Sequence, residues 1–148
     1  AIATEITAAT TVPSTTSTLA YLDAFERFGV RRIGLVTPYT SDVNDQVIDT
    51  YRALGVEVVG SVALGLQDNE SFARVDPEEL LPGSRAMCTV RPDAIVYLCT
   101  NLYGALVTQQ VEAETGVPVL DSVAVTLWRC LELAGAKLLD QRWGRLLS

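Results

Sequence analysis

Polar side chains that could do chemistry follow three apolar stretches of this 148-residue sequence. The stretch IGLV is followed by TPYTSDVN (37–44), VALGL by QDNES (67–71), and IVYL by CTNL (99–102). If the apolar stretches are parallel strands, their carboxyl ends meet at one edge of a sheet, which is where ligands bind in such folds. The three segments would then bring a phenol, amides, hydroxyls and a thiol together.

Cys99 has the most specific position of these residues, because it lies between a predicted strand and a predicted helix start. A helix N-terminus favours the thiolate and so lowers the pKa of a thiol, and its free backbone N–H groups can bind a carboxylate. The position therefore favours a nucleophilic or acid–base thiol. The plainer interpretation, a small buried residue, stays open for Cys99, and we expect it for Cys88 and Cys130 on amphipathic helices.

The other polar residues also have purely structural interpretations. One of Thr40, Ser41 and Asp42 is expected to cap the helix that follows it. The pair Asp68–Asn69 is typical of an ordinary loop, and Tyr39 beside a proline could be an aromatic residue at the rim of a site. These alternatives stay open at the level of sequence.

No cofactor or metal is expected from the residues present. The sequence contains no histidine and no C-x-x-C pair, which excludes His-based metal sites and a histidine general base within this chain. No G-x-G-x-x-G or Walker-type loop follows a strand, so nucleotide binding has no support. Acid–base work would fall to Cys, Tyr, Asp, Glu or Lys.

Helical and strand patterns alternate along the chain, with glycines or prolines at their ends. A helix capped by Thr16 or Ser17 is predicted to end at Gly29, and a helix with Val43, Val47, Tyr51 and Leu54 on one face to follow the first strand. Strands are predicted within residues 31–38, 56–65, 93–99 and 117–120, and helices within 1–10, 19–29, 41–55, 76–81, 102–116 and 122–135. Alternation with short links predicts one α/β domain over residues 1–148, a parallel sheet flanked by helices.

The composition and net charge of the chain limit the kinds of partner that it is expected to bind. Apolar residues make up 49% of the chain and charged residues 20%, which is typical of globular proteins. The net charge of −7 argues against nucleic acid or an anionic membrane as a partner. No apolar run is long enough to span a membrane, and AIATEITAAT at the start does not resemble a secretory signal. Three cysteines at unrelated spacings favour reduced thiols and a cytoplasmic location.

Several segments together resemble one known group of enzymes. VTPYTSDVN, LGLQDNESFARVDPEEL, DAIVYLCTNL and ETGVPVLDSVAVTLWRCLELAG occur in an order similar to that of maleate cis–trans isomerase and arylmalonate decarboxylase. Both belong to the aspartate/glutamate racemase superfamily, and the resemblance covers nearly the whole chain. The CTNL and DN elements look more like the isomerase, whereas the WGRLL tail is closer to the decarboxylase.

The resemblance implies a site at the junction of two similar α/β lobes, with one cysteine from each lobe. Cys99 matches the cysteine of the C-terminal lobe, Tyr39 and Asn69 match residues that contact a substrate carboxylate, and Thr100 and Asn101 would donate hydrogen bonds beside the thiol. It further implies a small dicarboxylate substrate, no cofactor, and a homo-oligomer. Cysteine-based covalent conversion of maleate to fumarate is the expected activity.

The sequence departs from the group in two places. The partner cysteine normally lies in a C-T-S-type motif ahead of the segment with which this sequence begins, so we expect the N-terminal lobe to be missing and the chain to be a fragment or half-enzyme. The pair Pro82–Gly83 is expected to interrupt a helix that the group usually continues.

Three other functions remain open. A decarboxylase of the same superfamily needs only one cysteine, which protonates an enediolate after carbon dioxide leaves. A racemase of aspartate, glutamate or a hydantoin is a further variant. The alternative outside enzymology is a non-catalytic α/β half-domain that binds a small ligand, in which Cys99 would react with alkylating reagents no faster than an ordinary thiol.

Overall fold

A single parallel sheet forms the centre of the protein. The computed structural model describes residues 2–136 and 144–147. Within them, β1 (Arg32–Thr37), β2 (Glu57–Ala63), β3 (Ala94–Tyr97) and β4 (Val119–Asp121) pair in the order β2-β1-β3-β4, and every pair is parallel. The predicted α/β class is therefore confirmed. The apolar runs of β1, β3 and β4 are almost entirely buried, as is typical of parallel strands covered on both faces, whereas the edge strand β2 is only half-buried.

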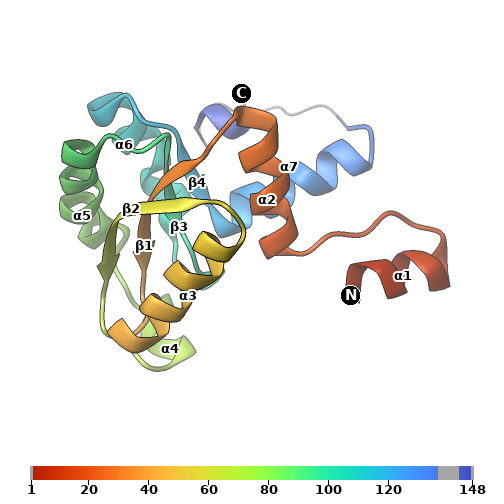
Figure 1. Ribbon diagram of the computed structural model, residues 1–148, viewed down its shortest axis with the longest axis horizontal. Coiled ribbons are helices and arrows are strands. Elements are labelled where there is room, and N and C mark those ends of the chain that lie inside the picture. Colours follow the sequence, from red (N-terminus) through yellow and green to blue (C-terminus); the bar gives the residue numbers. More distant parts are fainter. Residues whose placement is uncertain (1, 137–143, 148) are drawn as a thin grey trace.

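Helices cover the two faces of the sheet (Figure 1). Ile33, Leu35 and Val96 face a cluster built with α2, α3 and α7, whereas Val36 and Ile95 face a cluster built with α4, α5 and α6. The helical elements are α1 (Ile2–Thr10), α2 (Ser17–Phe28), α3 (Ser41–Ala53), α4 (Asn69–Ala73), η1 (Pro77–Glu79), α5 (Leu80–Met87), η2 (Cys88–Val90), η3 (Gly104–Val107), α6 (Thr108–Thr115), α7 (Ser122–Leu133) and η5 (Arg145–Leu147). None of them, within the described residues, is long and apolar enough to cross a bilayer.

The ends of α2 follow the sequence signals. The backbone N–H of Leu19 donates to the Thr16 hydroxyl at 3.2 Å, so Thr16 is the N-cap. Gly29 ends the helix with φ +68°, a conformation that favours glycine because it has no Cβ. The helix predicted over residues 1–10 also forms, and Figure 1 shows this α1 standing apart from the sheet and its covering helices.

Two local predictions are wrong. In α3, Val43 and Leu54 are exposed, because Asn44 faces inward instead: Thr37 donates to its Oδ1 at 2.9 Å, and its Nδ2 donates to Ser61 at 3.3 Å. Pro82–Gly83 does not interrupt α5, which runs through both residues. Pro82 lies in the first turn, where a backbone N–H has no partner within the helix, so the proline is tolerated.

One buried hydroxyl joins three elements at the carboxyl ends of β3 and β4. The Tyr21 hydroxyl on α2 donates to the Tyr97 carbonyl at 2.6 Å and lies 3.3 Å from the Leu120 carbonyl. It also lies 3.0 Å from the Ser122 hydroxyl at the start of α7. Burial raises the pKa of Tyr21 well above its usual value, so the phenol stays neutral and its proton stays in the bond.

We predict that Tyr21→Phe destabilises the fold, because the buried oxygen acceptors lose their donor. An unsatisfied buried polar group costs about 1–3 kcal/mol, and the free energy of unfolding from urea denaturation should fall by that amount. Tyr103→Phe is the matched control, since Tyr103 is 52% exposed. Equal stability of the two variants would contradict the role given to the Tyr21 hydroxyl.

Candidate active site

The polar segments singled out in the sequence meet at one edge of the sheet. Thr37 pairs with Ala63, and Tyr97 pairs with Asp121, so the carboxyl ends of the four strands are aligned. The segments that follow β1, β2 and β3 carry Tyr39, Asn69 and Cys99, respectively. This is the edge at which parallel α/β sheets bind ligands.

Tyr39 and Cys99 form the centre of the candidate site. Cys99 is 8% exposed, and the Tyr39 side chain packs against the apolar cluster that contains it, close enough for the two groups to interact electrostatically. The half-buried Tyr39 ring packs edge-on against Phe72, with 5.5 Å between the ring centroids. Burial raises the pKa of Tyr39 to about 12, and the charge of Cys99 adds to the rise. The phenol therefore stays protonated at neutral pH and can donate a hydrogen bond to sulfur or to a carboxylate.

The two asparagines lie beside each other at the same edge. The side-chain amide of Asn101 donates to the Asn69 backbone carbonyl at 3.5 Å, which links the segment after β3 to the start of α4. Asn69 is exposed and Asn101 is half-buried. Thr100, which lies between Cys99 and Asn101 in the chain, is exposed. The amides and hydroxyl are thus available to a ligand, and the structure brings together all three residues with the Tyr39–Cys99 pair on one edge.

Some polar residues of these segments do have the structural roles that we kept open. Asp68 caps α4 by accepting from the Ser71 backbone N–H at 2.9 Å and from its hydroxyl at 2.7 Å. Thr40 is the N-cap residue of α3, although its side chain makes no capping hydrogen bond. The Thr40 hydroxyl instead binds Asp42 and lowers the pKa of that exposed carboxyl.

The helical segment predicted over residues 102–116 does form, but it begins two residues later than expected, so Cys99 is not at a helix N-terminus. A turn at residues 100–101 follows β3, with the Leu102 N–H donating to the Cys99 carbonyl at 3.2 Å, and the first helical residue is Gly104. We refer to residues 98–103 as the Cys99 loop. Gly104 packs directly on the Tyr97 ring, because an added Cβ would lie only 2.3 Å from Cδ2 of Tyr97. The helical segment η3 begins at this contact. Tyr39, and not a helix terminus, is therefore the polar partner of the thiol.

The expectation for the other two cysteines is also wrong in part. Cys130 is exposed on α7, and Cys88 is half-buried in η2, ahead of β3 at the opposite edge of the sheet. The face of α7 that turns toward the core is held by Val125 and Trp128, which leaves Cys130 outside. Among the three cysteines, Cys99 is the one at the carboxyl edge.

Two further residues complete the surroundings of the site. Phe72 supports the Tyr39 ring and lines, with Leu66 and Gln67, an open pocket of about 310 Å³ next to Tyr39. Asp121 ends β4 beside Tyr97 and is 1% exposed. In the sequence, Asp121 could be identified as a helix cap from its place before SVAVTLW, but its burial could not be inferred.

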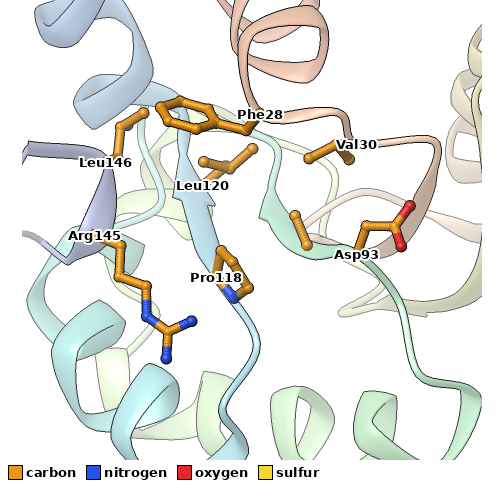
Figure 2. Close-up of a pocket in the computed structure, with 8 residues that line it drawn as sticks. Phe28, Val30, Asp93, Pro118, Leu120, Arg145 and Leu146 are labelled. Atoms are coloured by element: carbon orange, nitrogen blue, oxygen red, sulfur yellow. The ribbon is translucent and has the colours of Figure 1, made fainter.

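Within the described residues, no group of three or more His, Cys, Asp or Glu side chains is arranged to hold a metal ion. A second pocket of about 220 Å³ lies at the amino ends of the strands (Figure 2). It is mainly apolar, and its Asp93 carboxylate already accepts from the backbone N–H groups of Arg31 and Arg32 at 2.9 and 2.8 Å. None of the predicted site residues lines it.

Comparisons with known proteins identify relatives of this chain and of its fold. A maleate isomerase of Geobacillus stearothermophilus is 30% identical over 92% of this chain, and the arylmalonate decarboxylase of Bordetella bronchiseptica is 33% identical over 86% of it. The crystal structure of the maleate isomerase Iso from Pseudomonas putida S16 superposes with a TM-score of 0.85 at 34% identity, over 92% of this chain and 55% of that one.

The chain spans about half the length of the curated relatives it matches, 55% of the Geobacillus protein and 54% of the Bordetella protein. The family model for arylmalonate decarboxylase matches residues 1–147. The matched range includes every strand and the whole Tyr39–Cys99 edge, so this chain belongs to the arylmalonate decarboxylase family, together with its maleate isomerase relatives.

Proposed function

We propose that this chain forms one half of the active site of a cofactor-independent isomerase that converts maleate to fumarate. The observation that carries the proposal is the placement of Tyr39 beside the buried Cys99 at the carboxyl edge of the two central strands. A buried thiol beside a neutral phenol supports acid–base or covalent chemistry on a carboxylate substrate without histidine. The proposal concerns the complete protein, because the chain covers about half of its relatives' length.

The proposed reaction uses two thiols. A cysteine thiolate from the part of the family fold outside this chain adds to one carbon of the maleate double bond, and the neighbouring carbon takes a proton from the Cys99 thiol. The resulting succinyl thioether has a single bond in place of the double bond, so it can rotate. Cys99 thiolate then removes the proton, the carbon–sulfur bond breaks, and fumarate and the first thiolate are released. All atoms and electrons balance, so no co-reactant is consumed.

The residues around Cys99 suit the charge of such a substrate. The Tyr39 hydroxyl and the side-chain amides of Asn69 and Asn101 are neutral hydrogen-bond donors. Such donors can stabilise the negative charge of a carboxylate. Maleate is bound in the solved structure of Iso(C200A) from P. putida S16, which is 33% identical to this chain. A covalent succinylcysteine is described for the maleate cis–trans isomerase of Nocardia farcinica, although at 23% identity that protein shares only the fold with this chain.

Neither Cys88 nor Cys130 can supply the thiolate that adds to maleate opposite Cys99. Cys88 lies at the opposite edge of the sheet, and Cys130 is exposed on the outer side of α7. The scheme therefore requires a partner thiol from outside these residues, which agrees with the two-lobed architecture that the resemblance implies.

A malonate decarboxylase is the second candidate. It is favoured by the family model and by the 33% identity to the Bordetella enzyme, and it needs only Cys99 as proton donor. The two asparagines favour the isomerase, because they are the residues in which CTNL and DN resemble it. Proton NMR separates the two: fumarate formed from maleate supports the isomerase, whereas phenylacetate formed from phenylmalonate by loss of carbon dioxide, with no fumarate formed from maleate, supports the decarboxylase.

We predict that Cys99→Ala in the full-length protein lowers maleate turnover by about 10²–10⁴-fold, the contribution that is typical of an acid–base group. The measurement is fumarate formation by proton NMR at saturating maleate. Cys130→Ala is the matched control and should keep the wild-type rate, since its thiol is exposed and away from the site. Turnover retained in Cys99→Ala would remove Cys99 from the mechanism.

We further predict that Tyr39→Phe lowers kcat/KM by about 10²-fold, because it removes the hydroxyl donor and keeps the ring that packs on Phe72. Steady-state kinetics on maleate measure the loss. The thermal midpoint should change little, and Tyr103→Phe should leave both quantities unchanged. A Tyr39→Phe enzyme with wild-type kcat/KM would show that the phenol only fills space.

A further inference from the structure

Asp121 is a buried carboxyl group that the proposed reaction does not use. It ends β4, is 1% exposed, and lies beside Tyr97, the last residue of β3 before the Cys99 loop. One oxygen, Oδ1, accepts from the backbone N–H groups of Val123 and Ala124 at 2.9 and 3.0 Å and so caps α7. The other oxygen, Oδ2, is buried and has no hydrogen-bond partner among the described residues.

Capping alone does not explain a carboxyl group at this position. Serine or asparagine would cap α7 equally well and would not place an ionisable group in the interior, where charge is costly. Burial raises the pKa of Asp121 to about 6, even though the backbone N–H groups of Ala124, Val123 and Ala105 favour the charged form. The cap uses only Oδ1, so the buried and unpaired Oδ2 is left for a role other than capping.

The second oxygen faces the far end of the Cys99 loop. An added Cβ on Gly104 would lie 3.0 Å from Asp121 Oδ2, so the carboxyl group and the Gly104 backbone are in close contact. The N–H of the next residue, Ala105, faces the same carboxyl group. The near end of the loop is held separately, because the Leu98 N–H donates to the Val36 carbonyl at 3.0 Å. The two ends of the loop are thus held by different elements, β1 and β4.

We propose that Asp121 is a positioning residue for Cys99, and that its carboxylate, fixed on the N-terminus of α7, holds the far end of the Cys99 loop through Gly104 and Ala105. When the carboxylate is protonated, its attraction for the Ala105 N–H weakens and the loop is released. The inference rests on the proposed role of Cys99, but it concerns the geometry of the loop and can be tested without substrate.

The groups that surround Asp121 do not titrate between pH 5 and pH 7, so the titration of Asp121 can be observed by itself. The titratable groups that face it are Tyr21 from α2 and Tyr97 from β3, both neutral below pH 9 because burial raises their pKa values. Its neighbours from η3 and α7 are Gly104, Ala105, Val123 and Ala124, which carry no charge. A change in the loop between pH 5 and pH 7 would therefore report Asp121.

The experiment is the rate of Cys99 alkylation by iodoacetamide between pH 5 and pH 8, followed by intact mass spectrometry. Cys88→Ser and Cys130→Ser are introduced first so that only Cys99 reacts. Because the thiolate is the nucleophile, the logarithm of the rate should rise with slope one over most of this range. Below about pH 6 we expect rates at least threefold above that line, since release of the loop exposes a thiol that is otherwise 8% exposed.

Asp121→Asn should give a single line of slope one over the whole range, at least threefold above the wild-type rate at pH 7–8, because it keeps a capping oxygen, is neutral like protonated Asp121, and cannot titrate. Asp76→Asn is the matched control, because it removes the charge of an exposed capping residue at η1. Its alkylation rates below about pH 6 should exceed the line of slope one as those of the wild type do. If Asp121→Asn keeps the departure, or if the wild-type rates show none, the assignment is overturned. These outcomes do not depend on maleate turnover, so they are separate from the test of the isomerase.

A stability measurement covers the case in which Asp121→Asn folds poorly. The usual pKa of the group, 3.8, is raised in the folded chain, so the folded chain holds a proton that the unfolded chain has released between about pH 4 and pH 6. The free energy of unfolding should therefore lose a contribution as pH rises through this window. Asp121→Ser, which also retains a capping oxygen, should lack this loss and the departure in alkylation rate, and the assignment fails if it keeps either.

Discussion

The carboxyl ends of β3 and β4 are joined to α2 and α7 by the hydrogen bonds of the Tyr21 hydroxyl. This single group contacts the last carbonyl of β3, the carbonyl of Leu120 in β4 and the hydroxyl of Ser122 at the start of α7. Ser122 in turn donates to the Tyr97 carbonyl at 3.1 Å, so the network closes on itself. Cys99 follows Tyr97 by two positions, and the location of the thiol is therefore fixed by a tyrosine on the opposite side of the sheet.

The resulting edge is rich in neutral donors in a protein whose net charge is −7. Three carboxyl groups lie within three positions of the candidate residues along the chain: Asp42, Asp68 and Glu70. The hydroxyls of Thr40 and Ser71 lower the pKa values of Asp42 and Asp68 further below neutral pH, and Glu70 forms an ion pair with Arg74. A dianionic substrate would therefore be repelled by the surface around the site. Its binding must come from short-range hydrogen bonds, and the Tyr39 phenol and the asparagine amides provide these without carrying charge of their own.

Periodicity and capping signals were sufficient to predict the sheet, most helix ends and the edge at which the site lies. Thr16 and Gly29 bound α2 as their chemistry indicates, and Tyr39 and Cys99 meet because parallel strands align their carboxyl ends. Three features depend on contacts between distant residues and could not be predicted: the inward rotation of Asn44 toward Ser61, the delay of the helix after Cys99 by the Gly104–Tyr97 contact, and the burial of Asp121. Each is decided by packing, whereas sequence patterns report local preferences.

The hydrogen bonds of Tyr21 also have a consequence for how the chain folds. They join residues separated by 76, 99 and 101 positions, so most of the chain must be closed into loops before the first of them forms. Loop closure of this length opposes folding through chain entropy, and its cost falls before any contact at the site can offset it. Until these long loops have closed, Cys99 lacks its native surroundings, and its thiol is as accessible to oxidants and alkylating agents as that of any cysteine in an unfolded chain.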